Sequence, residues 1–289
     1  MESEDRAALT VMVLCPRFSP LAVLALAAFC TCQRPAFVRN PHLQLLKADP
    51  DASLEHPIVA PDGATVFYIS AGSWLCRLDI AADTAVALRE GWLQAFAISP
   101  DGTRLALLGR ELLLADTAGA VLDTLVPAES IESDPVDVEF GLDGSRIYYS
   151  VRSYSHGAFY YRVGLDGTGR ELVHESYGSA ESPRGVAGFD LTVEDSVVDY
   201  YAGQNWPQFS PLNGDIMAYA SSGWFGSHGD ITLLNLSTGA ATALECNPYR
   251  QSWTDYPYWF PDGRKLVFAA TDSGRSGPYQ LWTLDDIEY

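Results

Sequence analysis

The stretch "ISPDGTRLALL", residues 98–108, decides the fold. Its proline presets φ at the start of a tight turn, and the Asp and Gly that follow tolerate the positive φ values which such turns require. The residues after the turn alternate, so that every second side chain can face a neighbouring sheet. The stretch therefore predicts a turn that leads directly into a short β-strand.

Similar stretches occur four more times along the chain. They are "VAPDGATVFYIS" (59–70), "FGLDGSRIYYS" (140–150), "FSPLNGDIMAYAS" (209–221) and "WFPDGRKLVFAA" (259–270). Counted from the Asp or Asn before each Gly, successive copies are separated by 39, 42, 70 and 49 residues. A repeat of about 40 residues with this turn chemistry is typical of a propeller blade.

A second pair of strand-like runs, joined by a Gly, Asp or Thr turn, follows most copies. These pairs are "WLCRLDIAADTAVAL" (74–88), "LLLADTAGAVLDTL" (112–125), "FYYRVGLDGTGRELV" (159–173) and "ITLLNLSTGAATAL" (231–244). Each unit then holds four short antiparallel strands, and no helix is predicted beyond the N-terminal leader. The alternative is a β-sandwich in which the Asp-Gly turns recur by chance.

The last unit supplies only three strands before the chain stops, the third being "YQLWTLDDIEY" (279–289). A fourth strand is available in "PHLQLLKAD" (41–49), which directly precedes the first turn copy. Pairing these two segments would close the ring and remove exposed strand edges. We expect an all-β propeller of five four-stranded blades; the long interval at 175–206 is either a decorated loop or a sixth blade.

The motifs "HPIVAPDG", "WLQAFAISPDG" and "NWPQFSPLNG" resemble the WD-like propeller repeat of TolB-type proteins. In that family a blade opens with an aromatic residue or His, then a Pro, then Ser-Pro-Asp-Gly. The resemblance covers residues 41–289, with departures at Gly-Leu-Asp-Gly (141–144) and at the inserted Leu212. It implies six blades and a protein-binding role in the cell envelope or periplasm; related propellers bind sugars or sit beside peptidase domains.

Residues 1–40 are interpreted as a leader and linker rather than as part of the domain, which we expect to span residues 41–289. The run "LAVLALAAF" (21–29) is too short to span a bilayer but suits a signal peptide, which predicts export to the periplasm or envelope. Cys30 or Cys32 resembles a lipidation site, with a poor match to the lipobox. The alternative is a disordered apolar tail on a cytoplasmic protein.

The net charge of −19 argues against nucleic acid as a ligand, because such a field repels polyanions. It equally disfavours anionic lipid, so membrane association is expected only through a lipid anchor at the N-terminus. Cys76 and Cys246 lie in strand-like runs far apart in the repeat order, so we expect them to be unpaired and partly buried, and neither has the spacing of a zinc site. The chain is expected to be a monomer.

Unusual residues concentrate in the connections that a propeller places on the face opposite the Asp-Gly turns. Aromatic residues and arginines there can anchor a ligand, because aromatic side chains bury a large area at low entropic cost. For Trp206 and Tyr256 the alternative role is blade-closing core. The predicted ligand-binding residues are Arg152, Tyr154, His156, Trp206, Trp224, His228, Arg250, Trp253 and Tyr256.

His156, His174 and His228 fall on loops of adjacent units and could approach one divalent ion, although their spacing matches no ligand signature. No hydrolase elbow, zincin motif or phosphate loop occurs, so we expect no cofactor, no resident metal and no catalytic residue. The sequence favours a non-enzymatic propeller that binds an unidentified protein. The alternative is a carbohydrate-binding protein, or a metal-dependent lyase or hydrolase acting on glycans.

Overall fold

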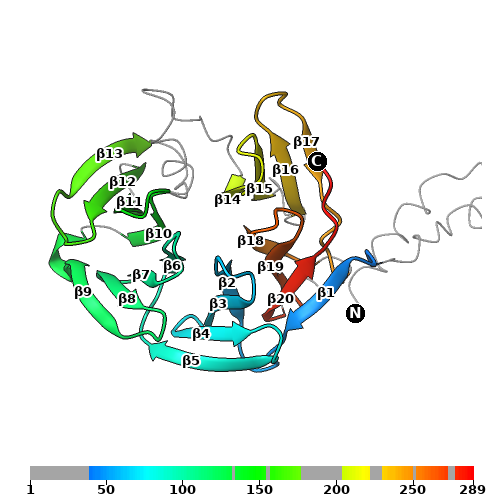
Figure 1. Ribbon diagram of the computed structural model, residues 1–289, viewed down its shortest axis with the longest axis horizontal. Helices are drawn as coiled ribbons and strands as arrows, with labels where there is room; N and C mark the ends of the chain where they lie inside the picture. Colours follow the sequence, from blue (N-terminus) through cyan, green and yellow to red (C-terminus); the bar gives the residue numbers. More distant parts are fainter. Residues whose placement is uncertain are drawn as a thin grey trace, which may run out of the picture. The chain divides into compact units, whose positions relative to one another are not determined.

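A computed structural model describes residues 39–131, 134–153, 157–176, 204–221, 230–249, 252–272 and 277–289. All of these residues belong to one compact unit, Arg39–Tyr289. They form five four-stranded antiparallel sheets around an axis (Figure 1), and the one helical element in these ranges is a 3₁₀ turn, Ala128–Ser130. The predicted propeller of five blades is confirmed.

In blades 1 to 4 the strands run in chain order from the axis outward, and in blade 5 the N-terminal strand β1 takes the outermost place. Blade 1 contains β2 (Leu54–Val59), β3 (Thr65–Ser70), β4 (Trp74–Asp79) and β5 (Thr84–Glu90); blade 2 contains β6 (Ala95–Ile98), β7 (Arg104–Leu108), β8 (Leu112–Asp116) and β9 (Val121–Val126); blade 3 contains β10 (Asp134–Phe140), β11 (Arg146–Ser153), β12 (Gly157–Gly164) and β13 (Glu171–Ser176). Blade 4 contains β14 (Gln204–Phe209), β15 (Ile216–Ser221), β16 (Asp230–Asn235) and β17 (Ala241–Ala243); blade 5 contains β18 (Thr254–Trp259), β19 (Leu266–Thr271), β20 (Tyr279–Leu284) and β1 (Leu43–Lys47).

The N-terminal strand completes the last blade, as predicted. β1 pairs antiparallel with β20, with Leu43 opposite Leu284 and Leu45 opposite Trp282. The side chains of Leu43 and Trp282 are 6% and 1% exposed. The edge of β20 is therefore hydrogen-bonded to β1 instead of lying open.

The same side-chain hydrogen bond occurs in all five repeat turns. The Asp or Asn before each Gly accepts a hydrogen bond at its Oδ1 from the backbone N–H two residues later, at 2.8–3.0 Å. Asp101 also accepts a hydrogen bond from the Ser99 hydroxyl, and these bonds to its charged form lower its pKa to about 2. The turn thus satisfies its own backbone where it meets water.

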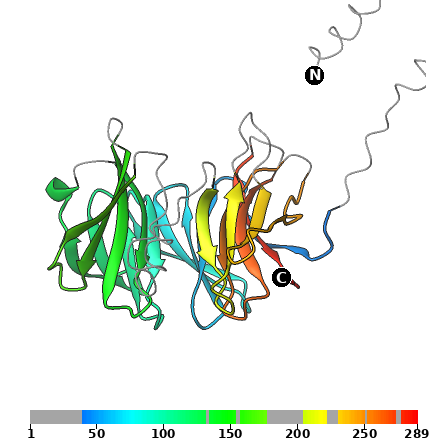
Figure 2. The same cartoon turned by 90° about the horizontal axis from the view of Figure 1, so that it is seen from above.

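The strands run along the axis (Figure 2), so the connections lie on two opposite faces. We call the face that carries the five Asp/Asn-Gly turns the turn face. The opposite face carries the blade-to-blade connections and the first residues of β2, β6, β10, β14 and β18, and we call it the loop face. Any ligand of the predicted site would approach from the loop face.

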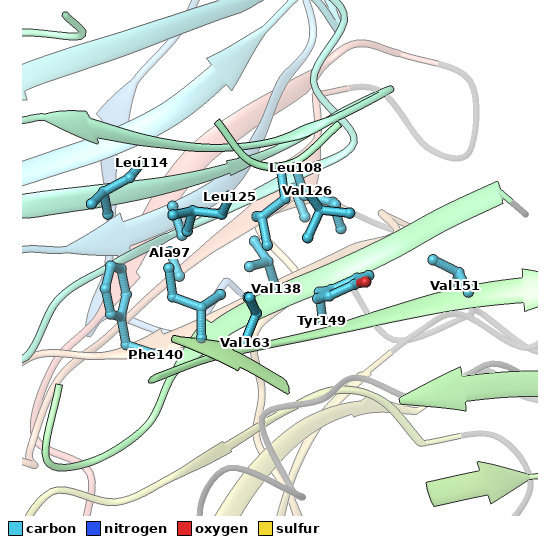
Figure 3. Close-up of a cluster of buried hydrophobic side chains, with 14 residues drawn as sticks. Ala97, Leu108, Leu114, Leu125, Val126, Val138, Phe140, Tyr149, Val151 and Val163 are labelled. Carbon is cyan, nitrogen blue, oxygen red and sulfur yellow. The ribbon is translucent and has the colours of Figure 1, made fainter. Parts of the chain in front are cut away.

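The core is a set of hydrophobic clusters between consecutive blades. Figure 3 shows the cluster between blades 2 and 3, in which Leu114, Leu125 and Val126 face Val138 and Phe140. Further clusters join blades 1 and 2, blades 5 and 1, and blades 4 and 5. Within the described ranges, no such cluster joins blades 3 and 4.

The turn face links the same blades by close backbone approach. A Cβ on Gly102 would lie 3.2 Å from Pro61 Cδ, and one on Gly144 would lie 3.5 Å from Pro100 Cδ. These glycines have φ of +72° and +69°, a region that L-residues with side chains rarely adopt. The turn motif is therefore required for blade-to-blade contact as well as for the turn itself.

The two domain cysteines are unpaired, as predicted, and are more deeply buried than expected. Cys76 and Cys246 are unpaired and buried, and burial is the main cause of the raised pKa of both thiols. In the described part of the chain no helix is long and apolar enough to cross a bilayer. β13 ends at Ser176 and β14 begins at Gln204, so both ends of the predicted insertion at 175–206 belong to strands. The rest of the insertion lies outside the described residues, and so does the sixth-blade alternative.

Candidate functional site

Three blades place an aromatic ring at one equivalent position of their innermost strands. His56 in β2, Trp206 in β14 and Tyr256 in β18 are each followed by proline, and their φ values are +51°, +54° and +55°. Strand pairing slips by one residue at each of these positions. Such a bulge re-aims a side chain, and the left-handed backbone of a non-glycine residue costs on the order of 1 kcal/mol or more.

The three rings meet one another. The His56 ring centroid lies 4.0 Å from that of Tyr256 and 4.7 Å from that of Trp206, while Trp206 and Tyr256 are 4.7 Å apart. His56 is buried, whereas Trp206 and Tyr256 are half-buried. We call these three residues the axial aromatic cluster. It joins blades 1, 4 and 5 at the loop-face half of their first strands.

Carboxyl groups adjoin this cluster. The Tyr279 hydroxyl donates a 2.8 Å hydrogen bond to Asp255 Oδ2, and burial raises the pKa of Asp255 to about 6 despite that bond. Burial also raises the pKa of Tyr256, with smaller contributions from the negative charges of Asp255, Glu55 and Asp137. The surroundings of the cluster therefore disfavour additional negative charge.

Trp253 lies just before β18, on the loop face. Its backbone N–H donates a 2.9 Å hydrogen bond to Thr271 Oγ1, which fixes the chain at the entry to blade 5. The indole Nε1–H is buried without an acceptor among the described residues. A buried donor in this state is costly, so an incoming acceptor would be favoured there.

The structure brings together some of the predicted ligand-binding residues and leaves others undescribed. Trp206 and Tyr256 are in ring contact, and Arg152 is exposed near the loop-face end of β11, opposite Asp134. The positions that lie outside the described residues are Tyr154, His156, Trp224, His228 and Arg250.

A metal-binding cluster of three or more His, Cys, Asp or Glu side chains does not occur in the described ranges. Of the three histidines considered as ligands, His156 and His228 are outside those ranges. His174 lies in β13 opposite Tyr160, and its side chain is not described. The expectation of no resident metal and the alternative of a histidine site therefore both stay predictions.

Sequence reasoning missed His56, Asp255 and Tyr279. The signal for His56 was present, because the dipeptide His56-Pro57 occupies the same repeat position as Trp206-Pro207 and Tyr256-Pro257. No local signal marks Tyr279, which reaches Asp255 from the third strand of blade 5. Trp92 was also missed; it is 51% exposed in the connection between blades 1 and 2.

Comparison with known proteins adds to the assignment of the fold. No family model matches the chain, and no curated protein sequence does. Among solved structures, TolB from Acinetobacter baumannii is 12% identical with a TM-score of 0.54, over 83% of this chain and 65% of that one. This chain thus spans slightly less than two thirds of that TolB.

Two further structures are similar over most of their length. Oligogalacturonate lyase from Vibrio parahaemolyticus has a TM-score of 0.56 at 12% identity, covering 86% of this chain and 95% of that one. The β-propeller domain of Cps50 (Swd1) from Myceliophthora thermophila has a TM-score of 0.54 at 10% identity, covering 85% and 100%. With the five repeat turns and the strand that closes the ring, these likenesses show that the chain has a TolB-like β-propeller fold.

Proposed function

We propose that this protein is a non-enzymatic propeller of the cell envelope that binds a partner protein through its loop face. The observation that carries the proposal is the axial aromatic cluster, which rests on three strained backbone positions and leaves Trp206 and Tyr256 partly exposed. Strain of this kind persists where a site needs it. Trp, Tyr and Arg are also the residues that dominate protein–protein binding energies.

Crosslinking from the loop face tests the proposal without disturbing the cluster. A photoreactive benzoylphenylalanine replaces Arg152 on the loop face and, as a matched control, Leu122, which is 56% exposed on the outer strand of blade 2. We expect one protein to be crosslinked from position 152 in intact cells and not from position 122. Trp206→Ala should reduce that adduct at unchanged expression and thermal stability.

The same experiment can refute the proposal. Equal adducts from both positions would indicate contact without a preferred face. An adduct from position 152 that survives Trp206→Ala and Tyr256→Ala would remove the axial aromatic cluster from the interface. Absence of any adduct in cells that express the full chain would count against a protein partner altogether.

The envelope location is proposed from the apolar run at 21–29 and from the TolB-like fold. Cell fractionation and mass spectrometry of the mature N-terminus test it. We expect removal of the leader; cleavage after residue 29 or 31, with a lipid on the cysteine that becomes the first residue, would add a membrane anchor. An intact N-terminus in the cytoplasmic fraction would contradict both export and lipidation.

A glycan ligand is the second candidate, favoured by the likeness to oligogalacturonate lyase over 95% of that protein's length. The acidic character of the chain, with Asp255 and Glu55 near the axial aromatic cluster, disfavours anionic sugars and favours neutral ones. A glycan array and elemental analysis of the purified chain test this candidate. Stoichiometric metal that is lost in His156→Ala and His228→Ala would favour it over the protein partner.

A further inference from the structure

The connection between blades 1 and 2 presents an exposed tryptophan on a fixed backbone. The Gly91 N–H donates to Ser73 O at 2.8 Å, and the Gln94 N–H donates to Leu108 O at 2.8 Å. Between them Leu93 is buried in the core at 8% exposure, while Trp92 is 51% exposed. The burial of its neighbour and the hydrogen bonds at both ends therefore hold Trp92 outward.

The turn of the neighbouring β7–β8 hairpin packs closely against this connection. A Cβ on Gly109 would lie 2.3 Å from the Trp92 carbonyl oxygen, so the β7–β8 turn approaches as closely as it does only because residue 109 is glycine. That turn carries Arg110, whose side chain is exposed. The two connections together form a ridge, defined by Trp92 and Arg110, on the loop face.

A pocket lies on each side of this ridge. The larger has a volume of about 420 Å³ and is lined by Trp92, Arg110, Ala128, Ile131, Asp134 and Pro135. The smaller, of about 180 Å³, shares Trp92 and Arg110 and adds Arg89 and Glu111 with the aliphatic side chains of Leu93, Leu107 and Leu113. An extended chain that crosses the ridge could place one side chain in each pocket.

The two pockets are lined by two arginines, Arg89 and Arg110, and two acids, Asp134 and Glu111, so they lack the acidic excess of the whole molecule. The chain has 37 acidic residues against 18 Lys and Arg. Even so, neither Arg89 nor Arg110 has an ion-pair partner among the residues that the structure describes. Guanidinium groups bind carboxylates with paired hydrogen bonds, so two such groups beside an exposed indole favour a carboxylate ligand.

We infer that the ridge of Trp92 and Arg110 binds an acidic peptide segment, which lays aliphatic side chains in the two pockets and a carboxylate on Arg110 and Arg89. The leucine lining of the smaller pocket favours an aliphatic side chain of a peptide over a sugar ring. The inference rests on the proposed function in that it names the chemistry of a partner at the loop face. It concerns residues separate from the axial aromatic cluster.

Peptide selection tests the inference. A display library of random twelve-residue peptides is selected against the full chain, and the enriched peptides are titrated by fluorescence anisotropy. We expect Asp or Glu within three residues of Leu, Ile or Val, and at least tenfold weaker binding to Trp92→Ala and to Arg110→Gln. The matched control is Trp74→Ala, since Trp74 is 37% exposed and lines neither pocket.

Each other outcome overturns the inference. Basic or uncharged consensus peptides, equal binding to Trp92→Ala, or no enrichment would all do so, and glycan binding that depends on Trp92 would assign the ridge to sugars. Trp206→Ala and Tyr256→Ala separate this inference from the proposed function, because they should leave peptide binding at the ridge unchanged. The ridge can therefore bind peptides even if the axial aromatic cluster binds no partner. Equally, the cluster can bind a partner even if the ridge binds no peptide.

Discussion

The junction between blades 1 and 2 and the junction between blades 3 and 4 come from the same repeat but are joined differently. At the first, a hydrophobic cluster spans both blades, and Gly102 packs against Pro61 on the turn face. At the second, the Pro position is Leu142, which is 60% exposed, and a Cβ on Gly214 would meet nothing within 4 Å. In the part of the chain that the structure describes, the turn-face contact that joins blades 1 and 2 is therefore missing between blades 3 and 4.

The side chains at these two junctions also differ in kind. Tyr149 of β11 packs toward blade 2, so its neighbours Tyr148 and Ser150 point to the opposite side of the sheet, toward blade 4. Both neighbours are buried, as is Tyr160 across the ladder from Ser150. That side of blade 3 thus carries buried polar and aromatic side chains.

The largest effect on stability is expected from removing a buried side chain at the junction between blades 1 and 2. Phe96 is fully buried in the cluster between blades 1 and 2. Phe96→Ala should lower the free energy of unfolding by about 3–5 kcal/mol, because it removes the buried ring and leaves a cavity. Urea denaturation followed by circular dichroism measures this. A loss below about 1 kcal/mol would mean that this junction does not carry the stability we assign to it.

The next effect concerns the axial aromatic cluster, which only blades 1, 4 and 5 build. The pKa of Asp255 is raised from 3.8 to about 6, so its buried carboxylate destabilises the fold at neutral pH. This cost falls as the pH drops through about 6 and is gone below about 4. Asp255→Asn should raise stability at pH 7 by about 1–3 kcal/mol and remove this pH dependence.

Thermal unfolding of wild type and Asp255→Asn between pH 4 and 8 measures that difference. The difference between the two proteins is the useful quantity, because other carboxylates such as Asp62 and Asp143 have lowered pKa values and act in the opposite direction. A constant difference across this range would contradict the raised pKa of Asp255.

A glycine pair compares the two junctions directly. Gly102→Ala forces a Cβ at φ +72° to within 3.2 Å of Pro61, and should cost about 1–2 kcal/mol. Gly214 sits at the same repeat position, its φ is not positive, and its surroundings are open. Gly214→Ala should be neutral or stabilising by up to about 1 kcal/mol. Equal losses of unfolding free energy for the two variants, measured by urea denaturation, would contradict this difference between the two junctions.

The smallest effect separates two exposed leucines. Leu142 and Leu212 are 60% and 63% exposed at equivalent turn positions, but only Leu212 approaches the next blade, at Gly263. We expect Leu212→Ala to cost about 0.5–1 kcal/mol and Leu142→Ala to stay within about 0.5 kcal/mol of wild type. Melting temperatures from differential scanning calorimetry test the order, and a reversed order would contradict it.

Much of the fold was predictable because its signals are local and repeated. Asp62 and Asp101 sit before glycines in turns that close with their own hydrogen bonds, wherever the turn lies in the chain. The closing strand was predictable for a different reason, since a blade that lacks one strand leaves an edge that only another strand can cover. The single long interval could not be resolved by this logic, because a loop and a degenerate blade have similar composition.

The candidate sites were predictable only in part. Trp206 and Tyr256 were predicted as aromatic residues of the loop face, but the neighbours that surround them come from other strands. Tyr279 reaches Asp255 across 24 residues of sequence, and nothing near either residue indicates that contact. Trp92 and Leu93 are adjacent and both apolar, and which of them is exposed depends on the packing of the next hairpin.

By itself the sequence determined the turns, the short alternating strands, the repeat length and the pairing of the chain ends, since proline and glycine torsions and side-chain alternation act over a few residues. The tertiary structure alone decided that His56, Trp206 and Tyr256 share one cluster and that Trp92 faces solvent. These relations depend on the order and angle in which whole blades pack. That packing is set by contacts between residues tens to hundreds of positions apart, which no local pattern encodes.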